Sequence, residues 1–378
     1  MRRIKVLHLR DTHEIGGPGK TILETHRAID PERFELHLGV FLRHGEPEDS
    51  PIIAEARRLD MPLHVIRGRY SFDLRMVSRV ADLVKTLKMD IVHAHEVKSD
   101  VIALLAARIC TVPLITTMHG WIGNGFKQRC LTALDKQIVR GFDQVIAVSR
   151  QIHDELRAHG IPQHRLKLVH NAIVIERYVR TGKSGAMAKL LGKAVKRPVI
   201  GSIGRLSAEK GHADLIEALA LVKKAGQEFM MVFIGDGPER GRLACQVEAL
   251  GLADSVYMPG YVRDPQALME EIDLMVLPSH TEGLPNAALE SLLMEIPVLA
   301  TSVGGTPEVI DDRQTGRLVP SHSPQWLAAA ILEYFADPDS WKQMALQGRE
   351  MVKERFDFRA RTRKIEAIYS DVIKRVVV

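Results

Sequence analysis

Short apolar runs alternate with longer amphipathic stretches along most of the chain, and this alternation constrains the fold more than any other feature of the sequence. The amphipathic stretches have roughly ten to fifteen residues, the length of a surface helix. Apolar runs of this kind are typical of strands in a parallel sheet, because crossover helices cover both faces of such a sheet. The runs fall at 4–9, 34–41, 63–66, 91–94, 114–118, 144–148 and 166–169, and then at 199–203, 229–234, 256–258, 274–277, 298–301 and 317–319. The pattern predicts an α/β protein with two parallel sheets.

The length of 378 residues exceeds one ordinary domain core and predicts two domains. Residues 181–197 are rich in Lys, Gly and Ala and carry no strand pattern, which is typical of a linker. We therefore expect one α/β domain over residues 1–180, a linker over 181–197, and a second α/β domain over 198–357. Residues 358–378 are expected to form a C-terminal helix.

Two glutamates surround a Gly/Pro turn just after the predicted strand 274–277. We expect Glu282 on a loop and Glu290 on the helix that follows, with Pro285 in the first helical turn, where a missing N–H costs nothing. Ligands of open α/β sheets bind beyond the carboxyl ends of the strands. Carboxylates there can accept hydrogen bonds from hydroxyl groups, while the free N–H groups of the helix N-terminus bind an anion. The pair suits a ligand that carries both sugar and phosphate groups, although both glutamates could also be ordinary solvent-facing charges of a helix start.

Two cations follow the predicted strand 199–203 in the same way. Gly204 and Arg205 begin a turn, and Ser207 is expected to cap a helix over about 212–225, so that Arg205 and Lys210 flank a helix start. A forked guanidinium, a compact ammonium and helix N–H groups together suit a diphosphate. Taken singly, each cation could be an ordinary surface charge.

These segments together resemble a known family. The matching motifs are Gly204-Arg205-Leu206 with Lys210-Gly211, Glu282-Gly283-Leu284-Pro285-Asn286 with Glu290, Gly304-Gly305-Thr306-Pro307-Glu308, and Thr315-Gly316-Arg317-Leu318-Val319. Their order and spacing resemble the C-terminal half of the retaining glycosyltransferases of family 4. The resemblance implies the GT-B fold, in which two Rossmann-like domains face each other across a cleft and the last helix crosses back onto the first domain. It also implies an acceptor-binding N-terminal domain and a C-terminal domain that binds the nucleotide sugar.

The resemblance also implies roles for individual residues. His119, which directly follows the predicted strand 114–118, matches the family histidine that contacts the donor sugar, whereas His93 and His95 are expected to make structural hydrogen bonds. The implied catalytic residues are His119, Arg205, Lys210 and Glu282. The implied donor-binding residues are Gly17, Gly204, Arg205, Lys210, Gly235, Val262, Glu282, Gly283, Leu284, Pro285, Asn286 and Glu290. Within this set, Glu290 would accept hydrogen bonds from the ribose hydroxyls, and Glu282 would hold the sugar.

The activity implied by the resemblance is transfer of a sugar from a UDP- or GDP-linked donor to an acceptor hydroxyl, with retention at the anomeric carbon. The acceptor would be a glycan, a lipid-linked glycan or a small molecule, and no cofactor or metal is expected, because cations and helix dipoles already oppose the diphosphate charge. The Asp-x-Asp sequence Asp337-Pro338-Asp339 lies at a helix junction and is typical of capping. Two other classes stay open: a nucleotide-sugar epimerase or phosphorylase on the same scaffold, and a non-enzymatic nucleotide-binding protein.

The net charge of +5 is unevenly distributed, with +7 over residues 1–180 (28 Lys and Arg against 21 Asp and Glu) and −2 over the rest. Basic residues at 127, 129, 136 and 140 lie among apolar ones, which predicts either an anionic membrane surface as a partner or a core-facing helix with a solvated basic side. Few aromatic residues and no recognition motif argue against nucleic acid. The three separated cysteines, the short apolar runs and a start that leads directly into a strand predict a cytoplasmic protein, at most peripheral to a membrane.

Overall fold

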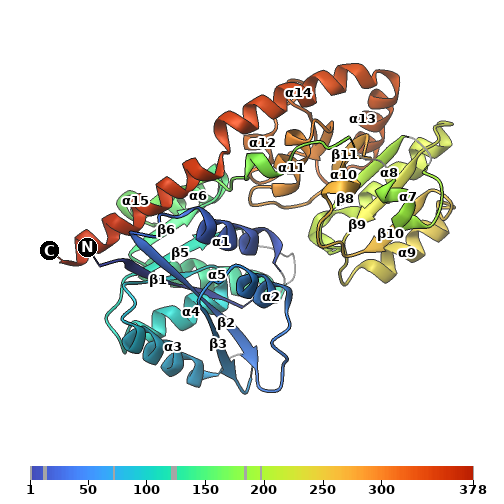
Figure 1. Cartoon of the computed structure of the whole chain (residues 1–378). Coiled ribbons are helices and arrows are strands. Elements are labelled where there is room, and N and C mark those ends of the chain that lie inside the picture. The colour runs from blue at the N-terminus through green and yellow to red at the C-terminus, as the bar shows by residue number, and fades with distance from the viewer. Residues whose placement is uncertain are drawn as a thin grey trace. The chain divides into compact units, whose positions relative to one another are not determined.

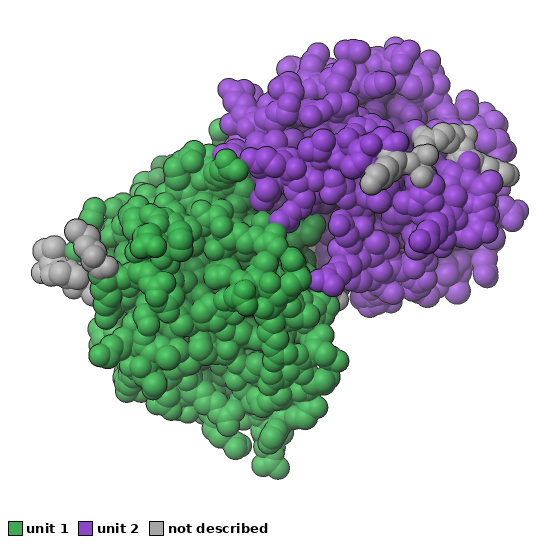
Figure 2. Space-filling model, in the orientation of Figure 1, with its two compact units in different colours: residues 1–172, 358–378 green, residues 173–357 purple. Residues whose placement is uncertain are grey.

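The computed structural model describes residues 2–11, 15–70, 73–120, 126–182, 185–195 and 198–377, without the side chains of 126–131 and 376–377. The chain divides into two compact units, which Figure 2 colours separately. Unit 1 consists of Met1–Ala172 and Phe358–Val378, and unit 2 consists of Ile173–Asp357.

Unit 1 contains a seven-stranded, wholly parallel sheet in the order β3-β2-β1-β4-β5-β6-β7 (Figure 1). The strands are β1 (Ile4–Arg10), β2 (Phe34–Arg43), β3 (Leu63–Gly68), β4 (Ile91–Ala94), β5 (Leu114–Met118), β6 (Gln144–Ala147) and β7 (Leu166–Leu168). The helices are α1 (Gly16–Ala28), α2 (Pro51–Arg58), α3 (Leu74–Leu87), α4 (Val97–Ala106), α5 (Phe126–Ile138), α6 (Arg150–Ala158) and α15 (Phe358–Val377). The strand order reverses between β1 and β4, which creates the crevice where doubly wound sheets bind ligands.

Unit 2 contains a six-stranded parallel sheet in the order β10-β9-β8-β11-β12-β13. The strands are β8 (Val199–Ile203), β9 (Met230–Ile234), β10 (Val256–Gly260), β11 (Leu274–Leu277), β12 (Val298–Thr301) and β13 (Arg317–Val319). The helices are α7 (Ala186–Leu191), α8 (His212–Lys224), α9 (Arg240–Ala249), α10 (Gln266–Met269), α11 (Asn286–Leu293), α12 (Thr306–Val309), α13 (Pro324–Ala336) and α14 (Pro338–Arg355). The reversal lies between β8 and β11, so unit 2 repeats the Rossmann order.

Each unit has its own apolar core. In unit 2 the strands β8, β9 and β11 pack against α8 and α13, with Phe233 and Trp341 among the large buried side chains. In unit 1 the core between the sheet, α1 and α2 also contains Ile365, Ile368 and Tyr369 from α15. The last helix of the chain is therefore part of the core of the first unit, and the chain crosses between the units at two places.

All thirteen predicted strands are present, with ends that differ from the predicted ones by at most two residues. The segment expected as a linker, residues 181–197, is part of unit 2, and so are residues 173–180, which the sequence places in the first domain. Two contacts explain this: Thr181 donates backbone and side-chain hydrogen bonds to Glu270, and the fully buried Met187 donates its backbone N–H to Glu271. The sequence pattern shows neither contact, because both partners lie about 80 to 90 residues away along the chain.

Candidate functional site

The predicted donor-binding residues of unit 2 lie together because they follow four adjacent strands at one edge of the sheet. Gly204 and Arg205 follow β8, Gly235 follows β9, Val262 lies after β10, and Glu282 lies five residues after β11. Parallel strands present their carboxyl ends at the same edge, and the order reverses between β8 and β11. The edge of the sheet at this reversal is the candidate site.

Lys210 and Glu282 form a direct ion pair at this edge. Lys210 Nζ donates to Glu282 Oε1 at 2.5 Å, and Ser279 Oγ donates to the same oxygen at 2.7 Å. The side chains of Lys210 and Glu282 are 29% and 13% exposed, so the pair is partly withdrawn from water. Partial burial strengthens the attraction relative to a surface pair. A cation and a carboxylate are thus held within one hydrogen-bond length of each other.

Glycines let three loops approach closely around this pair. A Cβ on Gly304, which has φ +57°, would lie 1.7 Å from the carbonyl oxygen of Glu282. A Cβ on Gly211, with φ +64°, would lie 2.0 Å from the carbonyl oxygen of Pro278. A Cβ on Gly235 would lie 1.8 Å from the carbonyl oxygen of Gly204. Only glycine accommodates these approaches, so backbone packing sets the positions of Glu282 and of the loop that carries Lys210.

The helix starts differ from the predicted ones. Ser207 precedes a 3₁₀ turn, Ala208–Lys210, and its hydroxyl donates to Glu209 instead of capping α8, which begins at His212 after Gly211. Pro285 is the N-cap of α11 with extended backbone, so the helix begins at Asn286 and not at the proline. A proline at this position ends the preceding loop with a fixed φ. Arg205 is exposed, and Gly283 to Asn286 form the loop directly before and at the start of α11.

Glu290 is buried, with 4% of its surface exposed, in the second turn of α11. Its Oε1 accepts a hydrogen bond from the hydroxyl of Tyr178 at 2.8 Å. Burial, reinforced by the neighbouring Glu290 carboxylate, raises the pKa of Tyr178, so the phenol stays protonated and remains a donor. Glu290 therefore acts as a hydroxyl acceptor in unit 2, and it is not a solvent-facing helix charge.

Unit 1 carries the remaining predicted residues. Gly17 lies in the first turn of α1, which begins at Gly16. His119 directly follows β5, and burial together with Arg10 lowers its pKa to about 3, so the ring is neutral. His93 and His95 make buried hydrogen bonds, as expected from the sequence. His95 Nδ1 lies 3.5 Å from His119 Nε2 and links these histidines.

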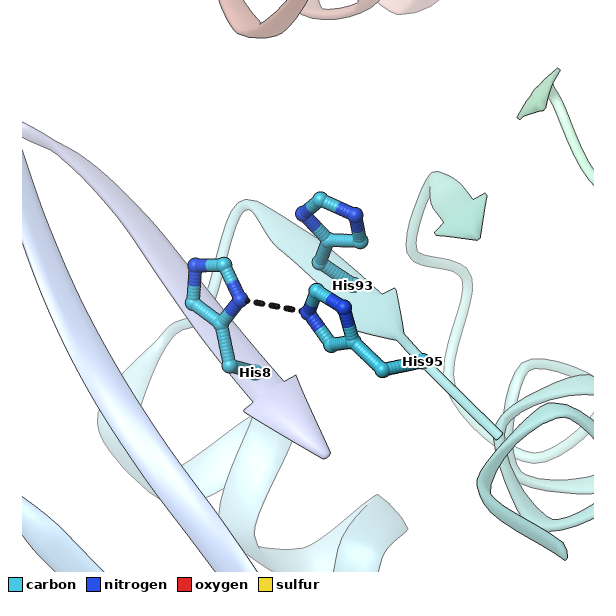
Figure 3. A group of neighbouring side chains, drawn as sticks. All are labelled: His8, His93 and His95. Atoms are coloured by element: carbon cyan, nitrogen blue, oxygen red, sulfur yellow. Dashed lines mark hydrogen bonds between the residues drawn. The ribbon is translucent and has the colours of Figure 1, made fainter. Parts of the chain in front are cut away.

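Two groups of side chains in the described part of the chain have ligand atoms close enough to hold a metal. In unit 1 these are His8 on β1, His93 on β4 and His95 just after β4, which Figure 3 shows close together. In unit 2 they are Asp214, His280 and His322, where His280 Nε2 lies 2.9 Å from Asp214 Oδ2. The sequence analysis identified neither group, because their members come from separate strands and loops.

The Asp-x-Asp sequence is a helix start, as predicted. Asp337 Oδ1 accepts a hydrogen bond from the Ser340 N–H and caps α14.

Lys136 of α5 and Arg140 of the turn after it have partners within unit 1. Lys136 pairs with Glu155 at 3.5 Å, and Arg140 donates to the carbonyl oxygen of His159. The side chains of Lys127 and Arg129 lie outside the described residues. Across the parts of the chain that the structure describes, no helix has the length and apolar character needed to span a membrane.

The sequence analysis missed two residues of the candidate site. Ser279 had a usable signal, because it lies two residues beyond the end of β11. Tyr178 had none, since it contacts Glu290 from 112 positions away in the chain.

Comparison with known families gives two matches. The model described as "Glycosyl transferases group 1" matches residues 186–351, and the model described as "Glycosyltransferase Family 4" matches residues 15–177. The two models together match most of both units.

Comparison with individual proteins agrees with these matches. The chain is 26% identical over 367 residues to a D-inositol 3-phosphate glycosyltransferase of Thermobispora bispora, covering 92% of this chain and 83% of that protein. It is 27% identical to the putative colanic acid biosynthesis glycosyltransferase WcaL of Salmonella typhimurium, covering 63% of this chain and 59% of that protein. Among solved structures, Anabaena Alr3699/HepE in complex with UDP-glucose superimposes with a TM-score of 0.87 at 23% identity, covering 98% and 100% of the two chains. Sucrose-phosphate synthase of Thermosynechococcus elongatus gives a TM-score of 0.81 at 19% identity, covering 98% and 100%. These structures share the two-sheet GT-B architecture with this chain.

Proposed function

The chain is a GT-B glycosyltransferase of family 4, and on this premise we propose that it transfers a sugar from a nucleoside diphosphate donor to an acceptor hydroxyl with retention and without a metal. The donor is a UDP- or GDP-linked sugar. Support for a uridine nucleotide comes from Anabaena HepE, whose solved complexes contain UDP and UDP-glucose. The acceptor is a glycan, a lipid-linked glycan or a small molecule; the colanic acid biosynthesis relative supports a glycan, and the D-inositol 3-phosphate glycosyltransferase supports a small molecule.

The pairing of Lys210 with Glu282 is the observation that carries this proposal. In a sugar nucleotide the sugar is bonded directly to the terminal phosphate. A site for such a donor therefore needs a cation for the phosphate and a carboxylate for the sugar hydroxyls within a few ångströms of each other. Lys210 Nζ and Glu282 Oε1 are 2.5 Å apart at the edge where the strand order reverses. When the donor binds, the side chain of Lys210 turns toward the phosphate, and Glu282 accepts a hydrogen bond from a sugar hydroxyl.

The reaction breaks the bond between the anomeric carbon and the phosphate oxygen and forms a bond between that carbon and the acceptor oxygen on the same face. Negative charge develops on the leaving phosphate, where Lys210 and Arg205 stabilise it most in the transition state. The phosphate oxygen takes the proton of the acceptor hydroxyl, so no protein nucleophile takes part. His119 contributes a hydrogen bond to a sugar hydroxyl as a neutral ring.

Product analysis tests the proposed function. The purified chain is incubated with UDP- and GDP-linked sugars and an extract of candidate acceptors, and NMR determines the anomeric configuration of the product. Acceptor-dependent release of the nucleoside diphosphate with retained configuration supports the proposal. An isomerised sugar nucleotide, phosphate-dependent cleavage, or binding without turnover would replace it with the epimerase, phosphorylase or binding-protein hypothesis, respectively.

Activity should persist in excess EDTA, because protein cations and helix N–H groups are proposed to neutralise the diphosphate. Initial rates with and without the chelator, after gel filtration, measure this. Loss of activity that magnesium or manganese alone restores would contradict the metal-free mechanism.

The two glutamates are expected to respond differently to replacement by alanine. Glu290→Ala should weaken binding of the bare nucleoside diphosphate by about 1 to 3 kcal/mol, since the ribose hydroxyls lose a buried acceptor. Glu282→Ala should leave that binding nearly unchanged and weaken binding or turnover of the intact donor. Calorimetry with the nucleoside diphosphate, and then with the sugar nucleotide, measures both effects.

Glu295→Ala is a suitable control for this comparison. Glu295 is also a partly buried glutamate of unit 2 with a charged partner, Arg349, and it follows the end of α11. It should change neither binding equilibrium. Equal weakening of nucleoside diphosphate binding by Glu282→Ala and Glu290→Ala would show that their roles are wrongly divided.

We also propose that the enzyme is cytoplasmic and that a lipid-linked acceptor would bind it at the cytoplasmic face of a membrane. The basic excess of residues 1–180 supports contact with anionic lipid. Cosedimentation with vesicles that contain anionic lipid, compared with neutral vesicles, distinguishes this contact from a purely soluble reaction.

A further inference from the structure

A row of hydrogen-bonded side chains crosses unit 1 from His119 into its core. His8 on β1 and His93 on β4 are register partners in neighbouring parallel strands, and His95 directly follows β4 (Figure 3). His95 Nδ1 lies 3.5 Å from His119 Nε2, and His95 Nε2 lies 2.9 Å from His8 Nδ1. The four histidines come from three adjacent strands: His8 and His93 lie within the last three residues of β1 and β4, and His95 and His119 directly follow β4 and β5.

Tyr369 extends this row from the C-terminal helix. Its hydroxyl lies 3.3 Å from His8 Nε2 and 2.8 Å from His93 Nδ1, and His93 Nε2 lies 2.8 Å from Thr117 Oγ1. Tyr369 is fully buried, and His8 and His93 are each 2% exposed. Every ring nitrogen of His8, His93 and His95 therefore has a protein partner, in a part of the unit from which water is excluded.

The chemistry of these groups restricts the hydrogen-bond pattern. A neutral imidazole has one N–H and one acceptor nitrogen, and a phenol has one hydrogen to donate. The buried hydroxyl of Tyr369 must donate to one of its two histidines and accept from the other. If His119 Nε2 donates, each following group donates to the next one as far as Thr117. If Thr117 donates, the direction of every bond reverses. The row thus has two fully satisfied patterns, and each of them corresponds to one tautomer of His119.

The surroundings favour neutral rings over cations. Burial lowers the pKa of His8 and of His119 to about 3, and the pKa values of His93 and His95 are also lowered by burial. The guanidinium of Arg361 is buried in the same core, where it donates to Thr25 Oγ1 at 3.1 Å. A positive charge nearby and hydrogen-bonded ring nitrogens both disfavour a metal ion on His8, His93 and His95.

The two hydrogen-bond patterns of the row differ in energy, because one end of the row is an imidazole and the other end is a hydroxyl. We propose that one pattern predominates, so that this row, completed by Tyr369 of α15, fixes His119 in a single neutral tautomer and its Nδ1 meets the donor sugar with a defined donor or acceptor role. His8, His93, His95 and Tyr369 are positioning residues that act through His119. The effect of the row on turnover rests on the proposed function, whereas the tautomer of His119 can be measured without any substrate.

The test uses the full-length enzyme labelled with ¹⁵N histidine, with the His119 signals assigned from a His119→Gln variant. In the wild type, ¹⁵N NMR between pH 5 and 8 should show His119 as one neutral tautomer. In Tyr369→Phe, the link between His8 and His93 is lost, and His119 should become a mixture of both tautomers. If transfer occurs as proposed, kcat should fall about tenfold, the loss expected for one buried hydrogen bond, with the KM for the donor within about twofold.

Ser370→Ala is the matched control, because Ser370 is the next residue of α15 and bonds to Glu366 and Arg33 outside the row. It should retain one tautomer and full kcat. If Tyr369→Phe does not fold, Thr117→Val opens the other end of the row with a near-isosteric side chain and should also alter the tautomer ratio. A mixture of both tautomers in the wild type, an unchanged single tautomer in the folded row variants, a protonated His119 at pH 6, or stoichiometric metal in the purified protein would each overturn the inference. Absence of sugar transfer alone would instead overturn the proposed function.

Discussion

Lys210→Ala should lower kcat by about 10²- to 10³-fold, the usual loss when one group that stabilises developing negative charge is removed. Arg205→Ala should have an effect of similar size. Both side chains lie at the edge of the unit 2 sheet where the strand order reverses, and neither belongs to the apolar core. The fold should therefore survive both changes, as judged by circular dichroism and thermal unfolding.

Lys224→Ala provides the control for a lost lysine. Lys224 is exposed at the opposite end of α8, which begins two residues after Lys210. This variant should keep normal kcat. Near-normal turnover of Lys210→Ala or Arg205→Ala, with the donor at saturation, would remove the assignment of these cations to the leaving phosphate.

Gly304→Ala is expected to destabilise unit 2 by about 3 kcal/mol and to abolish most turnover. Its new Cβ would lie 1.7 Å from the Glu282 carbonyl oxygen, and the φ of +57° adds strain for any residue with a Cβ. The segment that carries Glu282 must move, and the ion pair with Lys210 moves with it. Urea unfolding and steady-state kinetics measure the two effects.

The Gly226→Ala variant distinguishes the effect of steric overlap from that of an unfavourable backbone φ. Gly226 also belongs to unit 2 and has a φ of +85°, but a Cβ there would have no neighbour within 4 Å. This variant should lose only about 1 kcal/mol, the cost of the unfavourable φ, and it should keep its activity. If Gly304→Ala is no less stable and no less active than Gly226→Ala, then the close approach of Gly304 to Glu282 is not needed for stability or activity.

The fold could be predicted from the sequence because its strands are continuous apolar runs. Even β11, with four residues, is identifiable, since all four are buried and apolar. The helix starts were less predictable. At Pro285 the residue type suits both the N-cap and the first turn, and the difference is one of backbone ψ, which three-dimensional packing decides. The linker at 181–197 was misplaced because contacts with Glu270 and Glu271 are not visible in composition.

The candidate site was predictable where each residue follows its own strand, as Arg205, Gly235 and Glu282 do. It was not predictable where a distant segment supplies the partner. Tyr178 reaches Glu290 across 112 positions, and Tyr369 reaches His8 across 361. Such contacts depend on how the chain returns through each unit, and a single sequence carries no local signal for them.

Unit 1 also has a consequence for synthesis on the ribosome, because its sequence is interrupted by the whole of unit 2. At roughly 5 to 20 residues per second, about 10 to 40 s separate the emergence of Ala172 from that of Phe358. During this interval Phe34 and the core around it lack the cover of Ile365, Ile368 and Tyr369. The nascent first unit therefore exposes apolar surface until α15 has emerged, and in that interval it offers a binding surface to a cellular chaperone.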